Sequence, residues 1–250
     1  MAYSLRALGK NGLPEALSIA GKHYRLTKSV KHDFFAATGF YSDDHGTLVV
    51  LKMARIVDFA GVPLRWLGKW ICGRETRFYR RLADLPNVPR LLGYVGDTGF
   101  VHEFVIGRPL AKDKPVPDGF FQQLQDLLTE IHRRDIAYVD TNKPENILLG
   151  DDGRPHLIDF QISWDLHELG DWFLSREILR HFQREDFYHI LKHKRRLRPD
   201  ELTPAERERG GRKSFLIRLH RFVFKPYFLI RRRTFKRLRD SGRLLPEGSK

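Results

Sequence analysis

Two short apolar runs joined by a tight turn stand in the middle of this sequence. The runs are Asn146-Ile-Leu-Leu149 and His156-Leu-Ile-Asp159, and the segment Gly150-Asp-Asp-Gly153 between them is typical of a β-hairpin turn. Because the turn reverses the chain, Asn146 and Asp159 should return to the same edge of the two strands. Asp140 stands six residues before Asn146. The pattern predicts three oxygen-bearing side chains beside one short hairpin.

The sequence before this hairpin has the character of a β-sheet. Residues 24–106 contain five short β-like runs and one main charged helical run, and Ser42-Asp-Asp-His-Gly46 predicts a hairpin between the second and third runs. Residues 1–22 are expected to form an N-terminal arm or a short helix. We therefore assign residues 23–106 to a β-rich N-terminal lobe.

After Gly107 the pattern becomes helical. Asp118 is placed to cap a helix. The apolar residues of this helix recur every three or four positions, as on one buried helix face: Phe120, Phe121, Leu124, Leu127, Leu128 and Ile131. Residues 107–250 are therefore expected to form a compact, mainly helical C-terminal lobe that ends in basic helices over 190–250. The fold class expected for the whole chain is α+β with two lobes.

A lysine and a glutamate upstream change how the hairpin residues are interpreted. Lys52 ends the apolar run Val49-Val-Leu, and Glu75 follows 23 residues later in a helical run. Alone, each is typical of an exposed strand or helix surface. Together with the hairpin residues, they match the needs of phosphoryl transfer from ATP, which are a cation at the phosphates, a carboxylate to hold that cation, a carboxylate near the acceptor hydroxyl, and oxygen ligands for Mg²⁺.

In order and spacing, these residues resemble the motifs of the protein-kinase-like superfamily over residues 24–165. VVLK resembles the strand lysine motif, VDTNKPENILL the catalytic loop, IDF at 158–160 the start of the metal-binding motif, and FVHEFVIG at 100–107 the fifth strand and hinge. The compact second lobe is more similar to atypical branches, such as bacterial lipopolysaccharide-core sugar kinases and RIO-like kinases. The resemblance implies a two-lobed kinase-like fold.

The resemblance assigns the nucleotide to the N-terminal lobe. Lys52 would position the ATP phosphates and pair with Glu75, while backbone groups of Glu103 and Val105 would contact adenine. No G-x-G-x-x-G run precedes Lys52, and the expected turn reads Ser29-Val-Lys-His-Asp33. Lys28 or Lys31 is therefore expected to help hold phosphate.

The resemblance places the chemistry in the segment before and within the hairpin. Asp140 would accept or orient the proton of the acceptor hydroxyl, Lys143 would steady the transferring group, and Asn146 and Asp159 would bind Mg²⁺ or Mn²⁺. The loop from Asp140 to Asn146 is one residue longer than is usual in kinases. Asp135, five residues earlier, is too far from Asn146 in sequence to take the same role.

The segment after Asp159 is short for a kinase. Gln161 replaces the usual glycine, no A-P-E motif follows, and Ser163 is the only hydroxyl close behind Asp159. Control by phosphorylation of an activation loop is therefore not expected. All the catalytic groups are present, which favours an active enzyme over a degenerate pseudokinase.

The charge of the chain is concentrated at its C-terminal end. Residues 190–250 contain 20 Lys and Arg against 6 Asp and Glu, which accounts for the whole net charge of +14. Such a block favours an anionic partner, either membrane headgroups or a phosphorylated glycolipid. RNA would match the charge as well, although no RNA-reading motif is present. A solvated basic helix face is the alternative.

The composition also bears on the compartment. The single cysteine, Cys72, excludes an internal disulfide framework and a Cys-rich zinc site. No apolar run approaches the roughly 18 residues of a spanning helix, and the first residues lack the apolar region of a signal peptide. We expect a cytoplasmic protein, and peripheral attachment to the inner membrane face is compatible with this location.

The function expected from the sequence is ATP-dependent transfer of the γ-phosphate to a hydroxyl, on a lipopolysaccharide-core or other glycolipid sugar. The alternatives are an atypical, RIO-like serine/threonine protein kinase and a non-catalytic scaffold that docks on an anionic surface. Trp66 and Trp70, one helical turn apart, fit a lipid interface. Packing against the following helix is the other explanation for these two tryptophans.

Overall fold

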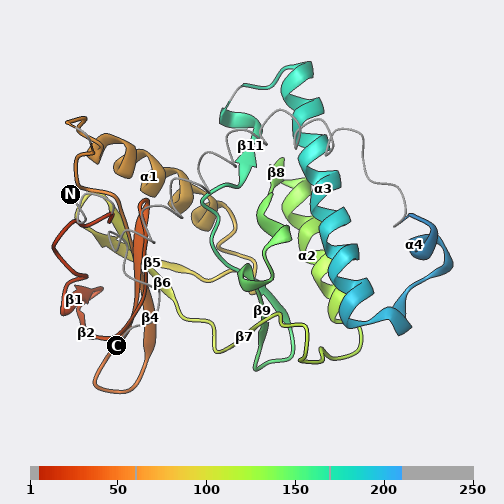
Figure 1. The fold of residues 1–250 in the computed structure, drawn as a ribbon, viewed down its shortest axis with the longest axis horizontal. Helices are drawn as coiled ribbons and strands as arrows, with labels where there is room; N and C mark the ends of the chain where they lie inside the picture. Colours follow the sequence, from red (N-terminus) through yellow and green to blue (C-terminus); the bar gives the residue numbers. More distant parts are fainter. Residues whose placement is uncertain (1–5, 60, 169, 210–250) are drawn as a thin grey trace, which may run out of the picture.

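The computed structural model describes residues 6–59, 61–168 and 170–209. Its N-terminal part is a six-stranded antiparallel sheet with the strand order β1-β2-β3-β4-β6-β5 (Figure 1). The strands are β1 (Ala16–Ile19), β2 (Lys22–His32), β3 (Ala36–Ser42), β4 (Leu48–Ala54), β5 (Leu91–Val95) and β6 (Gly99–Glu103). All five strands expected over residues 24–106 are therefore present, and the turn expected at residues 42–46 joins β3 to β4.

The sheet begins earlier than the sequence indicated. Residues 1–22 were expected to form an arm or a helix, but residues 16–19 form strand β1, which pairs with β2. Leu17 and Ile19 are buried, while Ala16 and Ser18 alternate with them on the exposed side. The alternation is only four residues long, too short to stand out as a strand pattern without its partner.

Helix α1 (Arg65–Arg81) connects β4 to β5 and includes the tryptophan-rich segment in its first two turns. Trp66 and Trp70 lie on α1 itself and are 63% and 58% exposed, so the alternative explanation, packing against a following helix, is wrong. Gly68 lets the helix approach the preceding loop, because a Cβ at this position would lie 2.0 Å from the carbonyl oxygen of Arg55. The opposite face of α1 is buried and carries Glu75 and Tyr79.

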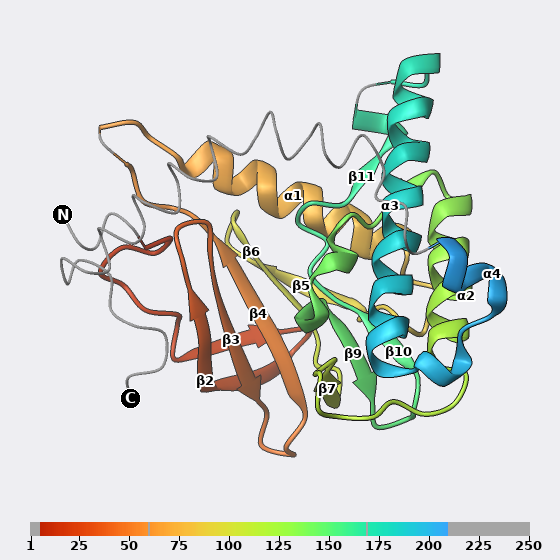
Figure 2. The ribbon, with the colours of Figure 1, turned by 45° about the vertical axis from the view of Figure 1, so that its right-hand side comes forward.

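The C-terminal part consists of two long helices and short strands (Figure 2). The helices are α2 (Phe120–Arg133), α3 (Phe173–Leu197) and the short α4 (Pro204–Arg209). Strands β7 (Gly107–Pro109), β9 (Ile147–Gly150) and β10 (Pro155–Leu157) form one sheet, and β8 (Ile136–Ala137) pairs with β11 (Trp164–Asp165). The hairpin expected around residues 150–153 is therefore confirmed as the β9–β10 turn.

Helix α2 has the buried face that its sequence predicts, since all six of its apolar residues named above are buried. Its start is different. Gly119, with φ of 72°, occupies the cap position and Asp118 makes no cap hydrogen bond. Asp118 is exposed instead and pairs with Arg198 at 2.8 Å.

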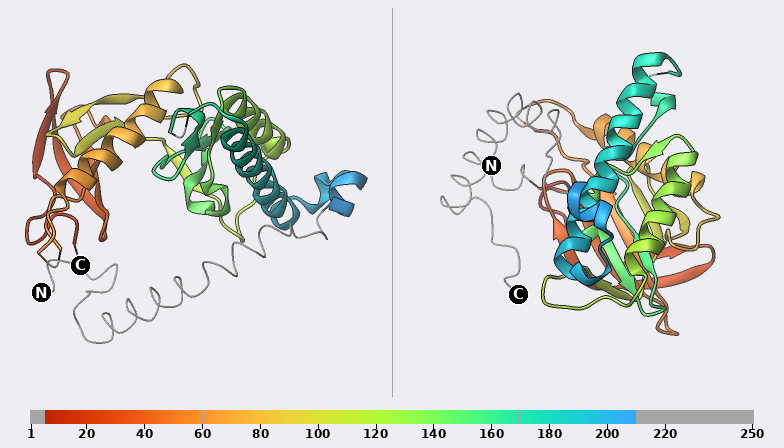
Figure 3. Two further views of the ribbon diagram at one scale, coloured as in Figure 1. Left: turned by 90° about the horizontal axis from the view of Figure 1, so that it is seen from above. Right: turned by 90° about the vertical axis from the view of Figure 1, so that its right-hand side faces the viewer.

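One hydrophobic core joins the two parts of the molecule, which lie on either side of α1 and the segment that follows β6 (Figure 3). Phe78 and Leu82 of α1, Phe121 and Leu128 of α2, and Phe160 beyond β10 all belong to this cluster and are fully buried. Because α1 and the residues after β10 share this core, their polar side chains are held in fixed relation at its edge.

The basic helices expected over residues 190–250 fall partly outside the described residues. The end of α3 and helix α4 account for residues up to 209, and residues 210–250, with Arg231–Arg233, lie beyond them. Within the described part of the chain, no helix is both long enough and apolar enough to cross a bilayer.

Candidate active site

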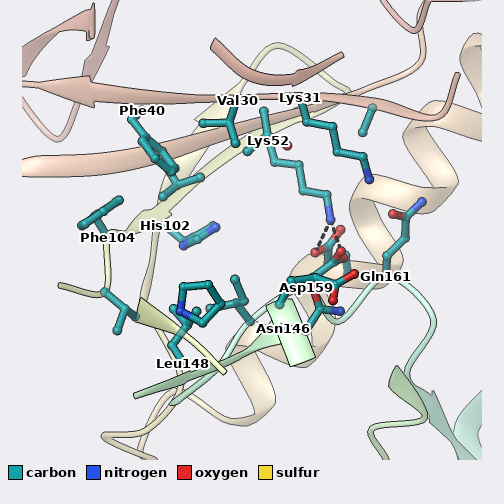
Figure 4. Close-up of a pocket in the computed structure, with 18 of the residues that line it drawn as sticks. Val30, Lys31, Phe40, Lys52, His102, Phe104, Asn146, Leu148, Asp159 and Gln161 are labelled. Atoms are coloured by element: carbon teal, nitrogen blue, oxygen red, sulfur yellow. Dashed lines mark hydrogen bonds and ion pairs between the residues drawn. The ribbon is translucent and has the colours of Figure 1, made fainter. Parts of the chain in front are cut away.

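Lys52 of β4 lies at the centre of a buried charge cluster. Its Nζ is 2.8 Å from Oε1 of Glu75 on α1 and 2.7 Å from Oδ1 of Asp159 (Figure 4). The three residues come from a strand, a helix and the turn after β10, separated by up to 107 positions. The expected pair of Lys52 and Glu75 is therefore formed, and Asp159 joins it.

Burial and pairing set the protonation of this cluster. Burial opposes the charge on Lys52, but the carboxylates of Glu75 and Asp159 outweigh it and hold the pKa of Lys52 above its ordinary value. Burial raises the pKa of Glu75 to about 7, against the charge of Lys52. Burial acts in the same direction on Asp159, but the charge and hydrogen bond of Lys52 prevail and lower its pKa to about 2. The cluster therefore presents a permanent cation beside an ionised Asp159.

Helix α1 is fastened to the segment after Asp159 by an arginine bridge formed by Arg74, Arg77 and Arg81. Arg74 Nε lies 2.5 Å from Glu168 Oε1, and its Nη groups donate to the carbonyl oxygens of Gln161 and Ser163. Arg77 shares the Glu168 carboxylate at 2.7 Å. Arg81 pairs at 2.6 Å with Asp165, which is fully buried. The bridge keeps Glu75 turned toward Lys52.

Asp140 lies in a short 3₁₀ helix, η2 (Asp140–Asn142), directly before a second one, η3 (Pro144–Asn146). Its Oδ2 accepts hydrogen bonds from Lys143 Nζ at 2.6 Å and from Asn146 Nδ2 at 2.7 Å. Burial raises the pKa of Asp140, with Lys143 acting against the shift. Asp140 is thus a better proton acceptor than an ordinary aspartate.

Asp135 is placed differently, as the sequence predicted. It follows helix α2 in an exposed turn with φ of 55°.

The extra residue of the loop from Asp140 to Asn146 is absorbed by the two consecutive 3₁₀ turns, which return Asn146 to the carboxylate of Asp140.

The residue that holds this loop in place was missed at the sequence level. Asp186 of α3 is fully buried, and its carboxylate accepts hydrogen bonds from the backbone N–H groups of Tyr138 and Val139, from Thr141 Oγ1 and from His132 Nε2. Val139 directly precedes Asp140 and has a φ of 68°, a strained value for a β-branched residue. The signal was available, because Asp186 interrupts the buried stripe of α3 that includes Leu179 and Ile190.

The turn between β2 and β3 replaces a glycine-rich loop with charged side chains. Asp33 Oδ1 accepts the backbone N–H groups of Phe35 at 2.8 Å and Ala36 at 2.9 Å, so these amides are already occupied. Lys31 pairs with Asp33 at 2.9 Å, and the pair lines the same cavity as Lys52. Of the two lysines expected to help hold phosphate, Lys31 lines the cavity and Lys28 does not.

These groups surround a cavity of about 550 Å³ with an apolar and a charged end (Figure 4). Val105 lines the apolar end, as expected, together with Phe40, Phe104 and Leu148. The charged end is lined by Lys31, Lys52, Glu75, Lys143, Asn146 and Asp159.

Two of the expected residues are not among those that line the cavity. The carboxylate of Asp140 lies behind Lys143 and Asn146, to which it is hydrogen-bonded. The Glu103 carboxylate pairs with Arg90, whose Nε lies at 2.7 Å, and the Glu103 carbonyl oxygen accepts a hydrogen bond from His102 Nδ1 at 2.8 Å. Asp140 therefore lies next to the cavity through its contacts with two lining residues, and Glu103 lies outside the cavity wall.

No protein-family model matches this sequence, and no curated protein matches it. Among solved structures, the chain is similar to the Rio2 kinase of Chaetomium thermophilum, determined as an ADP/Mg²⁺-phosphoaspartate complex. The TM-score is 0.54 at 18% sequence identity, and the match covers 76% of this chain and 58% of that one. The chain therefore corresponds to less than two thirds of the Rio2 chain. At this identity the likeness establishes the fold, and the chain has the α+β, protein-kinase-like fold.

Proposed function

We propose that this protein is an ATP-dependent phosphotransferase that moves the γ-phosphate of ATP to a hydroxyl group. The observation that carries the proposal is the meeting of Lys52, Glu75 and Asp159 at one end of a nucleotide-sized cavity, with Asp140 and Asn146 beside it. The Rio2 structure, which was solved with ADP and Mg²⁺, has the same fold and supports this proposal.

The geometry allows a simple mechanism. The oxygen of the acceptor hydroxyl attacks the γ-phosphorus, the bond from that phosphorus to the β,γ-bridging oxygen breaks, and ADP leaves with the bonding electron pair. The proton of the hydroxyl passes to Asp140, whose raised pKa favours this transfer. Lys52 and Lys143 offset negative charge on the phosphates before and during the transfer.

The residues present fit a magnesium ion. Asn146 uses its Nδ2 to bond Asp140, so its Oδ1 remains for a cation, and Asp159 contributes a carboxylate held ionised by Lys52. These are hard oxygen donors, and Mg²⁺ is commonly held by one or two protein oxygens together with substrate phosphates. When bound, the ion would neutralise phosphate charge. Among the described residues, no cluster of three or more His, Cys, Asp or Glu is found.

For the acceptor, we propose a glycolipid sugar such as that of a lipopolysaccharide core. The support is the exposed pair Trp66 and Trp70, flanked by Arg65 and Lys69, and the short segment after Asp159, which is tied to α1 by the arginine bridge. A protein serine or threonine is the second candidate, because the sequence resembles RIO-like protein kinases and the fold is similar to that of a Rio2 kinase.

The test measures transfer of γ-³²P from ATP by the full chain, with and without Mg²⁺. One reaction contains deacylated lipopolysaccharide core and a parallel one a Ser/Thr-rich protein. Labelling that depends on the core supports the glycolipid acceptor, and labelling of the protein alone supports the second candidate. Nucleotide binding without transfer to either would favour a non-catalytic scaffold. The Asp159→Asn variant should abolish transfer and serves as the background.

We further propose that the basic C-terminal residues hold the protein at the inner, cytoplasmic face of a membrane. Each basic residue near an anionic bilayer contributes about 1 kcal/mol, so replacing Arg231, Arg232 and Arg233 by Gln should weaken vesicle binding by roughly a hundredfold. Co-sedimentation with anionic and with neutral vesicles measures the effect. Equal binding to both lipids would contradict membrane docking, and salt-sensitive binding to RNA alone would favour an RNA partner.

A further inference from the structure

His102 is a buried, neutral imidazole in the wall of the nucleotide cavity. It is the penultimate residue of β6 and is 6% exposed. Its ring stacks on Tyr79, with ring centroids 5.2 Å apart and an interplanar angle of 17°. In Figure 4 the ring lies between the apolar end, marked by Phe104 and Leu148, and the charged end with Lys52. The mechanism proposed above does not use it.

The hydrogen bond of His102 fixes its tautomer. Nδ1 lies 2.8 Å from the carbonyl oxygen of Glu103, and a carbonyl oxygen accepts only, so Nδ1 carries the proton. Burial lowers the pKa of His102 to about 4, so the ring is neutral near pH 7. Nε2 is therefore an unprotonated acceptor. Within the described residues no protein donor is found for it.

The hydrogen bond between His102 and Glu103 affects which hydrogen-bonding groups the cavity wall presents to a nucleotide base. The Glu103 carbonyl oxygen, expected to meet adenine, accepts the hydrogen bond from His102 Nδ1, and Glu103 is not among the lining residues. The acceptor at this point of the wall is the side chain of His102 rather than the backbone. Because Nδ1 donates to the Glu103 carbonyl oxygen, Nε2 on the other side of the ring is the acceptor.

We propose that His102 selects the purine base of the nucleotide by accepting a hydrogen bond at Nε2 from a 6-amino group. This inference rests on the proposed function. A 6-amino purine presents an N–H donor there, whereas a 6-oxo purine presents a second acceptor, and two buried acceptors facing each other repel and remain unpaired. The cavity should therefore prefer ATP over GTP through a side chain.

The experiment compares three Mg²⁺-bound nucleotides by titration calorimetry on the full chain: ATP, GTP and purine riboside triphosphate, which lacks the 6-substituent. The wild type should bind ATP about tenfold more tightly than purine riboside triphosphate, the worth of one hydrogen bond, and GTP more weakly than either. In His102→Leu the preference for ATP over purine riboside triphosphate should vanish, while the affinity for the latter stays unchanged. His23→Leu, the same change at an exposed position of β2 outside the cavity, should keep the wild-type ratio.

A second measurement does not depend on how the variant folds. In the ¹⁵N-histidine spectrum of the wild type, the unprotonated Nε2 resonance of His102 should move upfield on addition of ATP and stay in place with purine riboside triphosphate. If His102→Leu binds ATP with the wild-type preference, or if Nε2 does not respond to ATP, the proposal is wrong while the phosphotransferase assignment stands. If the wild type binds no triphosphate, both fall together.

Discussion

Replacement of Asp186 tests whether a buried carboxylate outside the cavity lining holds Asp140, the proposed proton acceptor, in position. In Asp186→Ala, the N–H groups of Tyr138 and Val139 lose their acceptors inside the protein. Each unsatisfied buried donor costs about 1–3 kcal/mol, so the variant should lose roughly 4 kcal/mol of unfolding free energy. For a chain of this size that corresponds to a fall in Tm of roughly 10 °C.

The milder Asp186→Asn variant separates stability from catalysis. Its remaining oxygen can still accept from Val139 and Thr141, but its amide group faces the N–H of Tyr138 and Nε2 of His132. The Tyr138 N–H is left unpaired, whereas the His132 ring can change tautomer and accept from the amide. We expect a loss of about 1–3 kcal/mol and a folded protein at 25 °C. Release of the strained Val139 backbone should shift Asp140, and displacement of a reacting group by about 1 Å costs about a hundredfold in rate.

The assay is urea unfolding together with steady-state kinetics of phosphoryl transfer. In Asp186→Asn, kcat should fall about a hundredfold, while KM for ATP stays near the wild-type value because the Lys52 side of the cavity is untouched. Glu177→Ala is the matched control, since Glu177 lies on the same helix but is exposed and should change the unfolding free energy by less than about 0.5 kcal/mol. A destabilised Asp186→Asn protein with wild-type kcat would refute the positioning role.

Three further changes have clear expected results. Lys52→Met should abolish transfer and remove the stability that Asp159 gains from Lys52, yet leave a folded protein in urea unfolding, because Glu75, with its pKa already raised to about 7, can take a proton once the lysine charge is gone. Retained transfer would contradict the assignment. Asp140→Ala should slow transfer by about 10²–10⁴-fold, whereas Asp135→Ala should leave the rate unchanged, and the reverse order would mean that the loop is misassigned. The pKa of Asp159 is lowered to about 2 from 3.8, so its contribution to stability is present above pH 4 and disappears as the pH falls through 2. Acid unfolding should therefore show the stability gap between wild type and Asp159→Asn closing by about 2 kcal/mol between pH 4 and pH 2, and a gap that does not depend on pH would contradict the pairing.

Local spacing made much of the site predictable. Lys52, Glu75, Asn146 and Asp159 lie next to apolar runs whose periods define strands and a helix, so their order in sequence restricts where each can lie. The same reasoning distinguished Asp140, which contacts Lys143 and Asn146, from Asp135, which lies in an exposed turn. The expected contact of adenine with the Glu103 backbone stays a prediction, and in the structure that carbonyl oxygen accepts a hydrogen bond from His102.

The remaining features depend on contacts between distant parts of the chain. Asp186 lies 46 residues after Asp140, and only the packing of α3 brings its carboxylate to the loop. Likewise, the first turns of α1 carry exposed tryptophans and no side-chain cap, so the usual signals of a helix start are missing. Strand β1 is recognisable only once β2 supplies its partner.

The arginine bridge has a consequence for the discovery of inhibitors. A compound too large for the cavity could be accommodated only by an outward displacement of α1, the helix that carries Glu75. Here such a compound would first have to separate Arg74 and Arg77 from Glu168, and Arg81 from the buried Asp165. The free energy spent on that separation is subtracted from the affinity of the compound. We therefore expect screens against this protein to yield compounds that fit the cavity as it stands, between Val105 and Lys52, and few that require an outward-rotated helix.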